Sequence, residues 1–470
     1  MLKLSLNKLI KRFESHHQEH VFEYYDTLDV DGQNQLRAQA EMINLPEFDQ
    51  WVRRLVVEPS SDNFNLASIK APPYIEFLAD REANFLWQDA LKVGEEAIKK
   101  GLVAVVTVAG GQGTRLGFKG PKGGLQITPV RHKYLFQIFA EKILAAQHRY
   151  SAYIPWYIMT SSNNHEETLN FLERHRFFGL EKVELMTQDV FPCVDKRGKI
   201  LMESPSSIAM SPSGHGGVFK ALKKNGVFEK NEGKNIQLVS YHQVDNPLAR
   251  VIDPYFIGFH ILKHSEMSSK IVVKEATDEK VGVFCEVDGR LSVVEYSDLP
   301  EKLASEREQS GRLKFYAGNI ALHLIDRTFI EKINAESDLL PLHRAYKKIK
   351  TMSSDDMEDV PNGYKFELFV FDALPFAKNA LLFEVARKDE FSPIKNAVGD
   401  SSPQTCQKDM IELHARWLEL VGVQAPRNKL NQVTINLEIS PLFAEDAISF
   451  KKKWESLVKK PVITDSFYLE

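Results

Sequence analysis

Apolar positions follow two different patterns along the chain, and the change between them comes near residue 100. Before it, apolar side chains recur at helical spacing among charged positions, as in residues 36–55, so we expect residues 1–99 to be helical. After it, short β-branched or apolar runs alternate with helical stretches. These runs are residues 102–109, 156–159, 236–244, 270–273 and 281–287. Such alternation predicts βαβ units around a mostly parallel sheet.

A third pattern begins after Pro403. We expect a helix over residues 409–420, then a turn rich in proline and asparagine, two weak strands and a lysine-rich helix around residues 450–457. A chain of 470 residues is too long for one compact core. We therefore predict three domains: a helical N-terminal domain (1–99), a central α/β domain that carries the ligand sites (100–400) and a small C-terminal domain (401–470).

Composition and charge narrow the classes of partner. The formal net charge of −4 gives no electrostatic case for nucleic acid or an anionic membrane surface. The three cysteines, Cys193, Cys285 and Cys406, are widely separated and form no CxxC pair. The N-terminus lacks an apolar signal-peptide core, and the longest apolar run, residues 102–109, is far shorter than a membrane span. We expect a cytoplasmic protein whose anionic ligands are held by a local cluster of cations.

The most informative segment follows the apolar run at residues 102–109. It is a loop that contains four glycines, Gly110, Gly111, Gly113 and Gly117, and two cations, Arg115 and Lys122. Glycines allow backbone N–H groups to approach a ligand and form an anion-binding concavity. The cations add the full positive charge that a triphosphate requires. A plain turn between strand and helix would need neither cation, so we interpret the loop as a nucleotide phosphate site.

Spacing excludes the two commonest glycine-rich nucleotide motifs. No lysine stands where the P-loop pattern G-x-x-x-x-G-K-[ST] would place it. The dinucleotide pattern G-x-G-x-x-G also fails, because Leu116 occupies the position of its third glycine. Asp29 and Asp31 imitate the acidic D-x-D motif of glycosyltransferases and the start of a calcium loop, but no strand precedes them, and helix capping explains them better.

The loop sequence AGGQGTRLG at residues 109–117, with PKG at 121–123, resembles the signature of the UDP-sugar pyrophosphorylases, specifically the UDP-N-acetylhexosamine branch. The likeness spans roughly residues 30–400. Its further blocks are residues 155–161, 244–246, 253–259, 294–297, 317–319, 369–372 and 389–396. The last 60 or so residues match weakly.

The resemblance implies both a fold and an activity. The fold would be α/β, with a central Rossmann-like, mixed but mostly parallel sheet flanked by helices, as in nucleotidyltransferases and GT-A-like proteins. The activity would be that of a uridylyltransferase, which joins UTP to an N-acetylhexosamine 1-phosphate and releases pyrophosphate. N-acetylglucosamine 1-phosphate is the expected substrate. UTP and the sugar phosphate would be its partners, with Mg²⁺ or Mn²⁺ as cofactor; the oligomeric state stays open.

Asp245 is the predicted metal residue. It lies just past the apolar run at 236–244, and a carboxylate at the carboxyl end of a buried parallel strand faces the crevice where α/β sheets bind ligands. Such a group can hold Mg²⁺ against phosphate oxygens. The plain alternative is an Asp-Asn-Pro turn that ends the strand. The resemblance favours the first interpretation, because the family has a metal- and phosphate-binding aspartate here.

The resemblance also assigns roles that the residues alone would not. Lys395 would otherwise be taken for a solvated loop lysine, but the family binds substrate phosphate at this position. Residues 366–371 have the period of a strand, which places Phe369 and Phe371 with Glu367 on one face. That face is either plain core or the wall of a sugar pocket, and the resemblance implies contact with the N-acetyl group.

Two further sets of residues match the family's ligand contacts. The uridine pocket would be formed by Gln188, Met210, Pro212 and Gly214, where the glutamine amide can pair with uracil. The sugar hydroxyls would be met by Gly282, Glu295 and Asn319. Arg115 and Lys122 would stabilise pyrophosphate, and the backbone of Gly110, Gly111 and Gly113 would contact the nucleotide.

One departure bears on the sugar. The N-acetylhexosamine enzymes typically carry asparagine in a Gly-Asn-Gly-Gly block, whereas residues 214–217 read Gly-His-Gly-Gly. His215 resembles the UDP-glucose and broad-specificity branches, while Gly217 and the phenylalanine pair favour the N-acetyl branch. The alternatives are thus a UDP-glucose or UDP-galactose pyrophosphorylase, and a non-catalytic UDP-sugar-binding protein. A glycosyltransferase would need a D-x-D at a strand end, which residues 244–246 do not supply.

Overall fold

The structure is a computed structural model that describes residues 5–59, 69–111, 113–230, 233–336, 339–352 and 360–470. The chain forms two compact units, each assembled from three segments. The first unit comprises residues 1–66, 188–220 and 338–372, and the second comprises 67–187, 221–337 and 373–470. Two pieces of the predicted central domain therefore group with the N-terminal segment.

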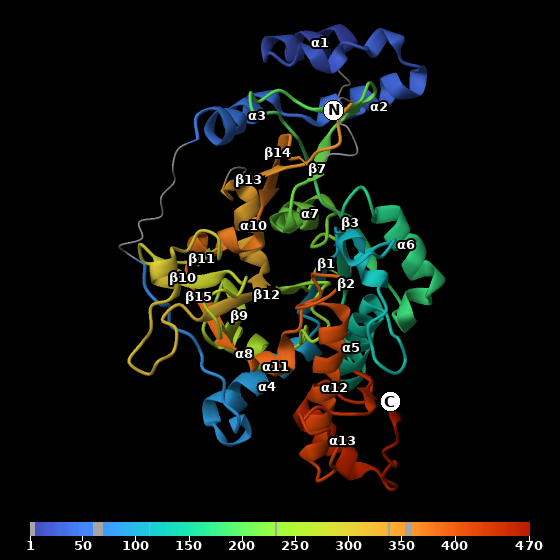
Figure 1. Cartoon of the computed structure of the whole chain (residues 1–470), viewed down its shortest axis with the longest axis vertical. Helices are drawn as coiled ribbons and strands as arrows, with labels where there is room; N and C mark the ends of the chain where they lie inside the picture. The colour runs from blue at the N-terminus through green and yellow to red at the C-terminus, as the bar shows by residue number, and fades with distance from the viewer. Residues whose placement is uncertain (1–4, 60–68, 112, 231–232, 337–338, 353–359) are drawn as a thin grey trace. The chain divides into compact units, whose positions relative to one another are not determined.

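The second unit is built on a nine-stranded mixed sheet (Figure 1). Its main order is β11-β10-β12-β8-β1-β2-β3, with β9 beside β12 and β15 beside β9. The strands β8, β1, β2 and β3 are parallel, whereas β12 runs antiparallel to both β8 and β9. Their bounds are β1 (Val103–Val108), β2 (Trp156–Thr160), β3 (Glu184–Thr187), β8 (Leu238–Gln243), β9 (Met267–Val273), β10 (Val283–Val287), β11 (Arg290–Val294), β12 (Ala317–Asp326) and β15 (Ala380–Glu384).

Helices flank this sheet, as the alternating pattern predicts. They are α4 (Phe85–Lys99), α5 (Leu135–Tyr150), α6 (His165–Arg174), α8 (Pro254–Leu262), α9 (Glu301–Ala304) and α10 (Arg327–Ala335), while α7 (Val218–Lys224) begins in the first unit and ends in the second. Two glycines allow α4 and α8 to cross at very short range. A Cβ on Gly94 would lie 1.8 Å from the Pro254 carbonyl oxygen, and one on Gly258 would lie 1.7 Å from that of Ala90.

The C-terminal segment continues the second unit with α11 (Arg387–Glu390), α12 (Pro403–Glu419), β16 (Asn436–Ile439), α13 (Ala447–Ser456) and β17 (Ser466–Leu469). The sequence predicted both long helices, but α12 begins six residues earlier than expected. Pro403 is its first residue, and the N-cap Ser402 forms a reciprocal capping box with Thr405 in the first turn of the helix. The expected pair of weak strands is present as parallel β16 and β17.

The first unit combines the N-terminal helices with short strands from later in the chain. Its helices are α1 (Leu6–Ser15), α2 (Val30–Met42) and α3 (Leu45–Val52). Its strands are β4 (Val190–Pro192), β5 (Met202–Ser204), β6 (Ser207–Ile208), β7 (Met210–Pro212), β13 (Leu342–Lys347) and β14 (Gly363–Leu368). Phe13, Leu36 and Phe48 share one core with Ile200 and Phe366. Asp29 caps α2 by accepting from the Gly32 N–H at 2.8 Å, as predicted.

The strand predicted over residues 366–371 is wrong in its second half. β14 ends at Leu368, and η10, a short 3₁₀ helix, follows at Val370–Phe376. The cause is a competing hydrogen bond: the Val370 N–H donates to Nδ1 of His215 at 3.1 Å and so leaves the strand ladder.

No helix among the described residues is both long and apolar enough to cross a membrane.

Candidate active site

The glycine-rich loop after β1 is anchored by the end of β2. Oγ of Ser161 donates to the Gly110 carbonyl at 2.9 Å, and Nδ2 of Asn164 donates to the carbonyls of Ala109 at 2.8 Å and Gly111 at 3.3 Å. Three consecutive carbonyls are therefore turned toward the β2 side of the loop. Ser161 and Asn164 are not among the site residues predicted from the sequence. Their position directly after an apolar run was the available signal.

Two short 3₁₀ helices carry the loop cations: η6 (Gly113–Leu116) holds the exposed Arg115, and η7 (Lys122–Gly124) begins with Lys122. The loop between them closes on itself, because the Gly113 N–H donates to the Gly120 carbonyl at 3.2 Å. At Gly123 a Cβ would lie 2.2 Å from the ring of Phe136, so a larger residue would displace η7.

Lys122 and Asp245 meet although 123 positions separate them in the sequence. Nζ of Lys122 lies 3.3 Å from Oδ2 of Asp245, and the two side chains are 17% and 14% exposed. Because β1 and β8 are adjacent parallel strands, the loops that follow them emerge at the same edge of the sheet. At this edge the lysine can bind a phosphate group, and the carboxylate can bind a metal ion that is also coordinated by the phosphate.

The segment that contains Lys395 is joined to Asp245 through backbone and amide hydrogen bonds. The Ile394 N–H donates to the Asp245 carbonyl at 2.8 Å. Asn246 donates from Nδ2 to the Glu390 carbonyl at 2.8 Å and accepts at Oδ1 from the Ser392 N–H at 3.0 Å. These contacts hold residues 390–394 against residues 245–246. Lys395 follows directly and its side chain is exposed.

The described residues contain no group of three or more His, Cys, Asp or Glu side chains that could hold a metal ion. Asp245 is a single carboxylate whose present partner is Lys122. This donor set fits Mg²⁺ better than a metal that needs a protein cage, since Mg²⁺ usually keeps several waters and binds through one or two carboxylates and substrate phosphates.

The residues predicted to meet the sugar hydroxyls lie together on the β10–β12 side of the sheet. The Asn319 N–H donates to the Gly282 carbonyl at 2.9 Å. A Cβ on Gly282 would lie 3.1 Å from Oε1 of Glu295. The three residues are thus neighbours in the second unit, although 37 positions of chain separate the first from the last.

The predicted uridine residues belong to the first unit. Antiparallel β4 and β7 place Met210 opposite Pro192 and Pro212 opposite Val190. Gln188 is 6% exposed, and its buried Oε1 has no hydrogen-bond partner among the described residues. An orphaned buried acceptor costs about 1–3 kcal/mol. The N–H of a pyrimidine ring would satisfy this atom.

Gly214 and Gly216 are required by close contact with the end of β14. A Cβ on Gly214, which has φ +83°, would lie 2.7 Å from the Leu368 carbonyl oxygen. One on Gly216 would lie 2.7 Å from the carbonyl carbons of Leu368 and Phe369. Because of this contact, His215, which lies between the two glycines, packs against Phe369 and Phe371.

Four rings cluster around Phe369 in the first unit; the two histidines stack on it and Phe371 is tilted against it. His215 stacks on Phe369 with centroids 5.2 Å apart, and His343 stacks on the same ring at 4.3 Å. Phe371 lies 5.2 Å from Phe369. Nε2 of His343 lies 2.7 Å from Oδ2 of Asp372, which fixes the imidazole against the ring. Because Nδ1 of His215 accepts from Val370, a neutral His215 carries its proton on Nε2.

His343 and Asp372 were not found from the sequence as site residues. A single histidine on a strand is more often a core or surface residue, and nothing in the spacing of His343 relates it to Phe369. The antiparallel pairing of β13 with β14 places it opposite Glu367 and so beside the phenylalanine pair.

Residues 45–440 match the family model described as UTP–glucose-1-phosphate uridylyltransferase. The chain belongs to this uridylyltransferase family. It is 36% identical over 459 residues to UDP-N-acetylglucosamine diphosphorylase 2 of Arabidopsis thaliana, covering 92% of this chain and 89% of that protein. It is 34% identical over 462 residues to UDP-N-acetylglucosamine pyrophosphorylase of Saccharomyces cerevisiae, covering 93% and 95%.

A solved member of the uridylyltransferase family has the same fold. The crystal structure of the uridine diphosphate N-acetylglucosamine pyrophosphorylase from Trypanosoma brucei, in complex with an inhibitor, aligns with a TM-score of 0.78 at 27% identity. The alignment covers 99% of this chain and 98% of that chain. The predicted family and the predicted nucleotidyltransferase-type α/β fold are therefore both confirmed.

Proposed function

We propose that this chain is a uridylyltransferase that forms UDP-N-acetylglucosamine and pyrophosphate from UTP and N-acetylglucosamine 1-phosphate. The observation that carries the proposal is the meeting of Lys122 and Asp245 at 3.3 Å beside the glycine-rich loop. The relatives named for this sugar nucleotide align over nearly the whole chain, which agrees with the proposal.

The reaction is an in-line displacement at the α-phosphorus of UTP. An oxygen of the sugar phosphate forms a bond to that phosphorus, and the bond to the bridging oxygen of the leaving pyrophosphate breaks. The nucleophile is already an anion at neutral pH, so no general base is required. Catalysis then consists of placing two polyanions in line and neutralising the charge that develops.

The cations divide this work between the two phosphates. Arg115 and Lys122 bind the leaving pyrophosphate, since both belong to the loop after β1. Lys395 binds the sugar phosphate, because its segment is held against residues 245–246 by the Ile394 and Asn246 hydrogen bonds. Mg²⁺ or Mn²⁺, held by Asp245 together with phosphate oxygens and water, would supply further positive charge to the same phosphates.

The phenylalanine pair favours an N-acetylated sugar. Phe369 and Phe371 offer an apolar wall that suits the acetamide methyl group better than a hydroxyl. The second candidate is a UDP-glucose or UDP-galactose pyrophosphorylase, and His215 is the residue that favours it. A non-catalytic UDP-sugar-binding protein would not require Lys122, Asp245 and Lys395 at one edge of the sheet.

A panel of sugar 1-phosphates tests the proposal. Purified chain is incubated with UTP, Mg²⁺ and the 1-phosphates of N-acetylglucosamine, N-acetylgalactosamine, glucose and galactose, and pyrophosphate release is measured. We expect kcat/KM to be highest for N-acetylglucosamine 1-phosphate. A higher value for glucose or galactose would support the second candidate, and binding of UDP-sugar without any pyrophosphate release would support the non-catalytic one.

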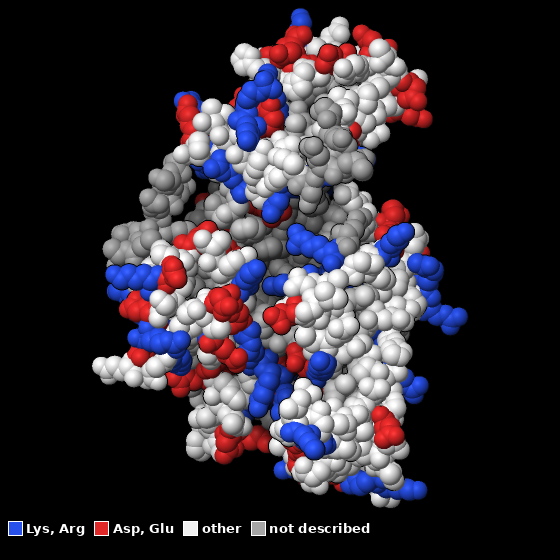
Figure 2. Space-filling view, viewed as in Figure 1, with Lys and Arg blue, Asp and Glu red and all other residues white. Residues whose placement is uncertain are grey.

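We also propose a cytoplasmic location and no nucleic-acid partner. Cys193, Cys285 and Cys406 are all free and buried, which agrees with a reducing compartment. On the coloured part of the face drawn in Figure 2, basic and acidic side chains are interspersed over the surface. Cell fractionation with an antibody to the chain would test the location.

A further inference from the structure

Asn164 occupies the N-cap position of α6, yet its side chain does not cap that helix. An asparagine at this position usually accepts a hydrogen bond from an N–H of the first turn. The Asn164 side chain makes no such bond. It is buried, and its Nδ2 donates instead to the carbonyls of Ala109 at 2.8 Å and Gly111 at 3.3 Å. The amide therefore serves the glycine-rich loop after β1 and not its own helix.

The orientation of the Asn164 amide is determined by Ser161. Oδ1 of Asn164 accepts from the Ser161 N–H at 2.9 Å, so Nδ2 must face the two loop carbonyls. The Ser161 hydroxyl lies 2.9 Å from the Gly110 carbonyl and 3.1 Å from Oδ1 of Asn164. Its single hydrogen is shared between these two acceptors, whereas Asn164 has one hydrogen for each carbonyl. Asn164 is thus the stronger of the two contacts to the loop.

These hydrogen bonds determine the direction of two loop N–H groups. In a planar trans peptide the C=O and the N–H that follows it point in opposite directions. Asn164 holds the carbonyl of the Ala109–Gly110 peptide, and Ser161 holds that of the Gly110–Gly111 peptide. The N–H groups of Gly110 and Gly111 consequently both point away from Ser161 and Asn164. In an extended strand, successive N–H groups would instead alternate between the two neighbouring strands.

The two N–H groups are available to a ligand. Neither donates a hydrogen bond to any residue that the structure describes. Gly111 is exposed, and a Cβ built on it would meet no atom within 4 Å apart from its chain neighbours. Consecutive backbone N–H groups that face the same side form a concavity suited to an anion. Gly110 and Gly111 thus present such a concavity to the acceptor oxygens of a nucleotide.

We propose that Asn164 and Ser161 are positioning residues for the nucleotide. By holding the carbonyls of Ala109 and Gly110, they keep the N–H groups of Gly110 and Gly111 directed at the oxygens of UTP before it binds. If the carbonyls are released, the two peptides can rotate, and UTP must order them at a cost in affinity. This inference rests on the proposed uridylyltransferase function and gives neither Asn164 nor Ser161 a contact with substrate.

Isothermal titration calorimetry with UTP and Mg²⁺ tests the proposal in three variants of the full chain. Asn164→Asp has nearly the same shape and keeps Oδ1 for the Ser161 N–H, but it turns an oxygen toward two carbonyl oxygens. We expect its Kd for UTP to rise at least about tenfold. Asn164→Ala removes the donor without adding repulsion and should lose less affinity than Asn164→Asp. Ser161→Ala removes only the shared hydroxyl and should lose about threefold.

The order of the two Asn164 variants separates positioning from packing. If Asn164 only filled space, the alanine variant would lose more affinity than the aspartate variant, because alanine leaves the larger cavity. Repulsion between a carboxylate and the loop carbonyls predicts the opposite order. Tm is measured for each variant alongside the titration, so that loss of folded protein is not counted as weak binding.

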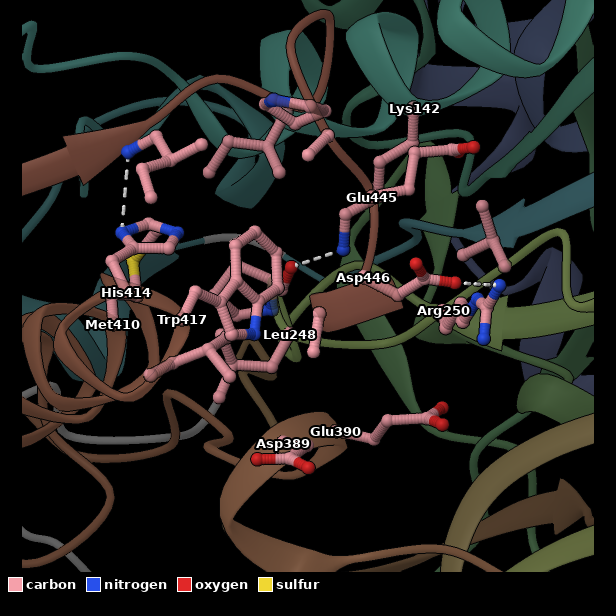
Figure 3. Close-up of a pocket in the computed structure, with 18 of the residues that line it drawn as sticks. Lys142, Leu248, Arg250, Asp389, Glu390, Met410, His414, Trp417, Glu445 and Asp446 are labelled. Atoms are coloured by element: carbon pink, nitrogen blue, oxygen red, sulfur yellow. Dashed lines mark hydrogen bonds and ion pairs between the residues drawn. The ribbon is translucent and has the colours of Figure 1, made fainter. Parts of the chain in front are cut away.

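Two control variants account for charge and for stability. Asn163→Asp adds the same charge one residue away, at an exposed position, and should bind UTP like the parent chain. Asp446→Asn removes the partner of Arg250; Figure 3 shows these two side chains facing each other at a cavity beside the C-terminal segment. This variant should lower Tm and leave the affinity for UTP unchanged.

Steady-state pyrophosphate release gives a second readout. In Asn164→Asp we expect KM for UTP to rise at least about tenfold and KM for N-acetylglucosamine 1-phosphate to change less than about twofold. Equal increases in both KM values would show general damage to the site and would contradict a role specific to the nucleotide.

The proposal is overturned if folded Asn164→Asp binds UTP as tightly as the parent chain, or if Asn163→Asp loses as much affinity. It is also overturned if Asn164→Ala binds UTP more weakly than Asn164→Asp. Should neither Asn164 variant fold, Ser161→Ala decides, and unchanged affinity there overturns the proposal. A parent chain that binds UTP but releases no pyrophosphate would contradict the proposed function alone, since the comparison of affinities does not depend on turnover.

Discussion

Lys122 is the residue whose replacement should affect turnover most directly. Its ammonium group lies 3.3 Å from Asp245, at the edge of the sheet where the pyrophosphate charge would develop in the proposed reaction. We expect Lys122→Ala to lower kcat by a factor on the order of 10²–10³, comparable with the loss of one donor from an oxyanion hole. Lys122→Arg keeps a cation and should lose less. Steady-state pyrophosphate release measures both, and a full rate in Lys122→Ala would show that this lysine does not contact the leaving group.

His343 should act as a positioning residue for the sugar. It stacks on Phe369 at 4.3 Å and is itself held by Asp372. An aromatic pair contributes about 0.5–1.5 kcal/mol, so His343→Ala should raise KM for N-acetylglucosamine 1-phosphate up to about tenfold. KM for UTP and kcat should change little.

The comparison between sugars distinguishes positioning by His343 from a loss of structure. Glucose 1-phosphate has no acetamide group for Phe369 to contact, so its KM should be the same in His343→Ala and in the parent chain. His343→Phe, which restores a ring on Phe369, should recover most of the affinity for the acetylated sugar. A rise in KM for both sugars would assign His343 to the fold alone.

Among the secondary-structure elements, η7 depends on a glycine. A Cβ on Gly123 would lie 2.2 Å from the ring of Phe136 in α5, so Gly123→Ala must displace either η7 or the ring. We expect Tm to fall and kcat to fall with it, because Lys122 begins the same element. The double variant Gly123→Ala with Phe136→Ala removes the ring atoms that clash and should recover activity relative to Gly123→Ala. Equal activity of the single variant and the parent chain would contradict this explanation.

The sequence predicted those elements whose own side chains determine them. The runs at residues 102–109 and 236–244 correspond to β1 and β8 within two residues at each end. β1 is almost continuously apolar, as a strand buried on both faces tends to be, whereas β8 also buries Ser240 and His242. The sequence did not predict β12, the strand that joins the two halves of the sheet. A bulge between Asn319 and His323 breaks the alternation of that strand.

The candidate site residues were likewise predictable from the sequence only where they lie close together in it. The glycines and cations of the loop after β1 could be recognised from their order alone, since they lie within a few residues of one another. The contacts that complete the site join distant segments: Val370 to His215, and Asn246 to Glu390. Such hydrogen bonds leave no periodic pattern in the sequence, so the end of β14 and the role of His343 could not be predicted.

At the scale of the whole molecule, the two compact units do not correspond to consecutive stretches of the sequence. The predicted linear domains are 1–99, 100–400 and 401–470, whereas the compact units interleave segments from across the chain. The first unit gathers the predicted uridine and acetamide residues, and the second gathers those predicted for phosphate, metal and sugar hydroxyls. A variant in one unit should therefore alter recognition of the base or acetamide without altering phosphate chemistry, and the reverse for the other unit.

The stability of the second unit should depend on pH through its buried histidines. Burial lowers the pKa of His260 to about 3, whereas an unfolded histidine titrates near about 6.5. Between these values the unfolded chain binds a proton that the folded chain does not, so stability is full above about pH 6.5 and is lost as the pH falls. Lowering the pH from 7 to 5 should reduce the free energy of unfolding by about 2 kcal/mol for His260 alone.

Urea unfolding at the two pH values measures this dependence, and a variant isolates the contribution of His260. His260→Gln removes the titrating group while its amide can still bond Oγ of Ser268, which lies 2.7 Å from Nδ1 in the parent chain. The variant should lose less stability than the parent chain between pH 7 and pH 5, by about 2 kcal/mol. His132→Gln, at an exposed position, should leave the pH dependence unchanged. An identical loss in His260→Gln and the parent chain would mean that the protonation of this histidine does not oppose folding, and the acid sensitivity would then have to arise elsewhere.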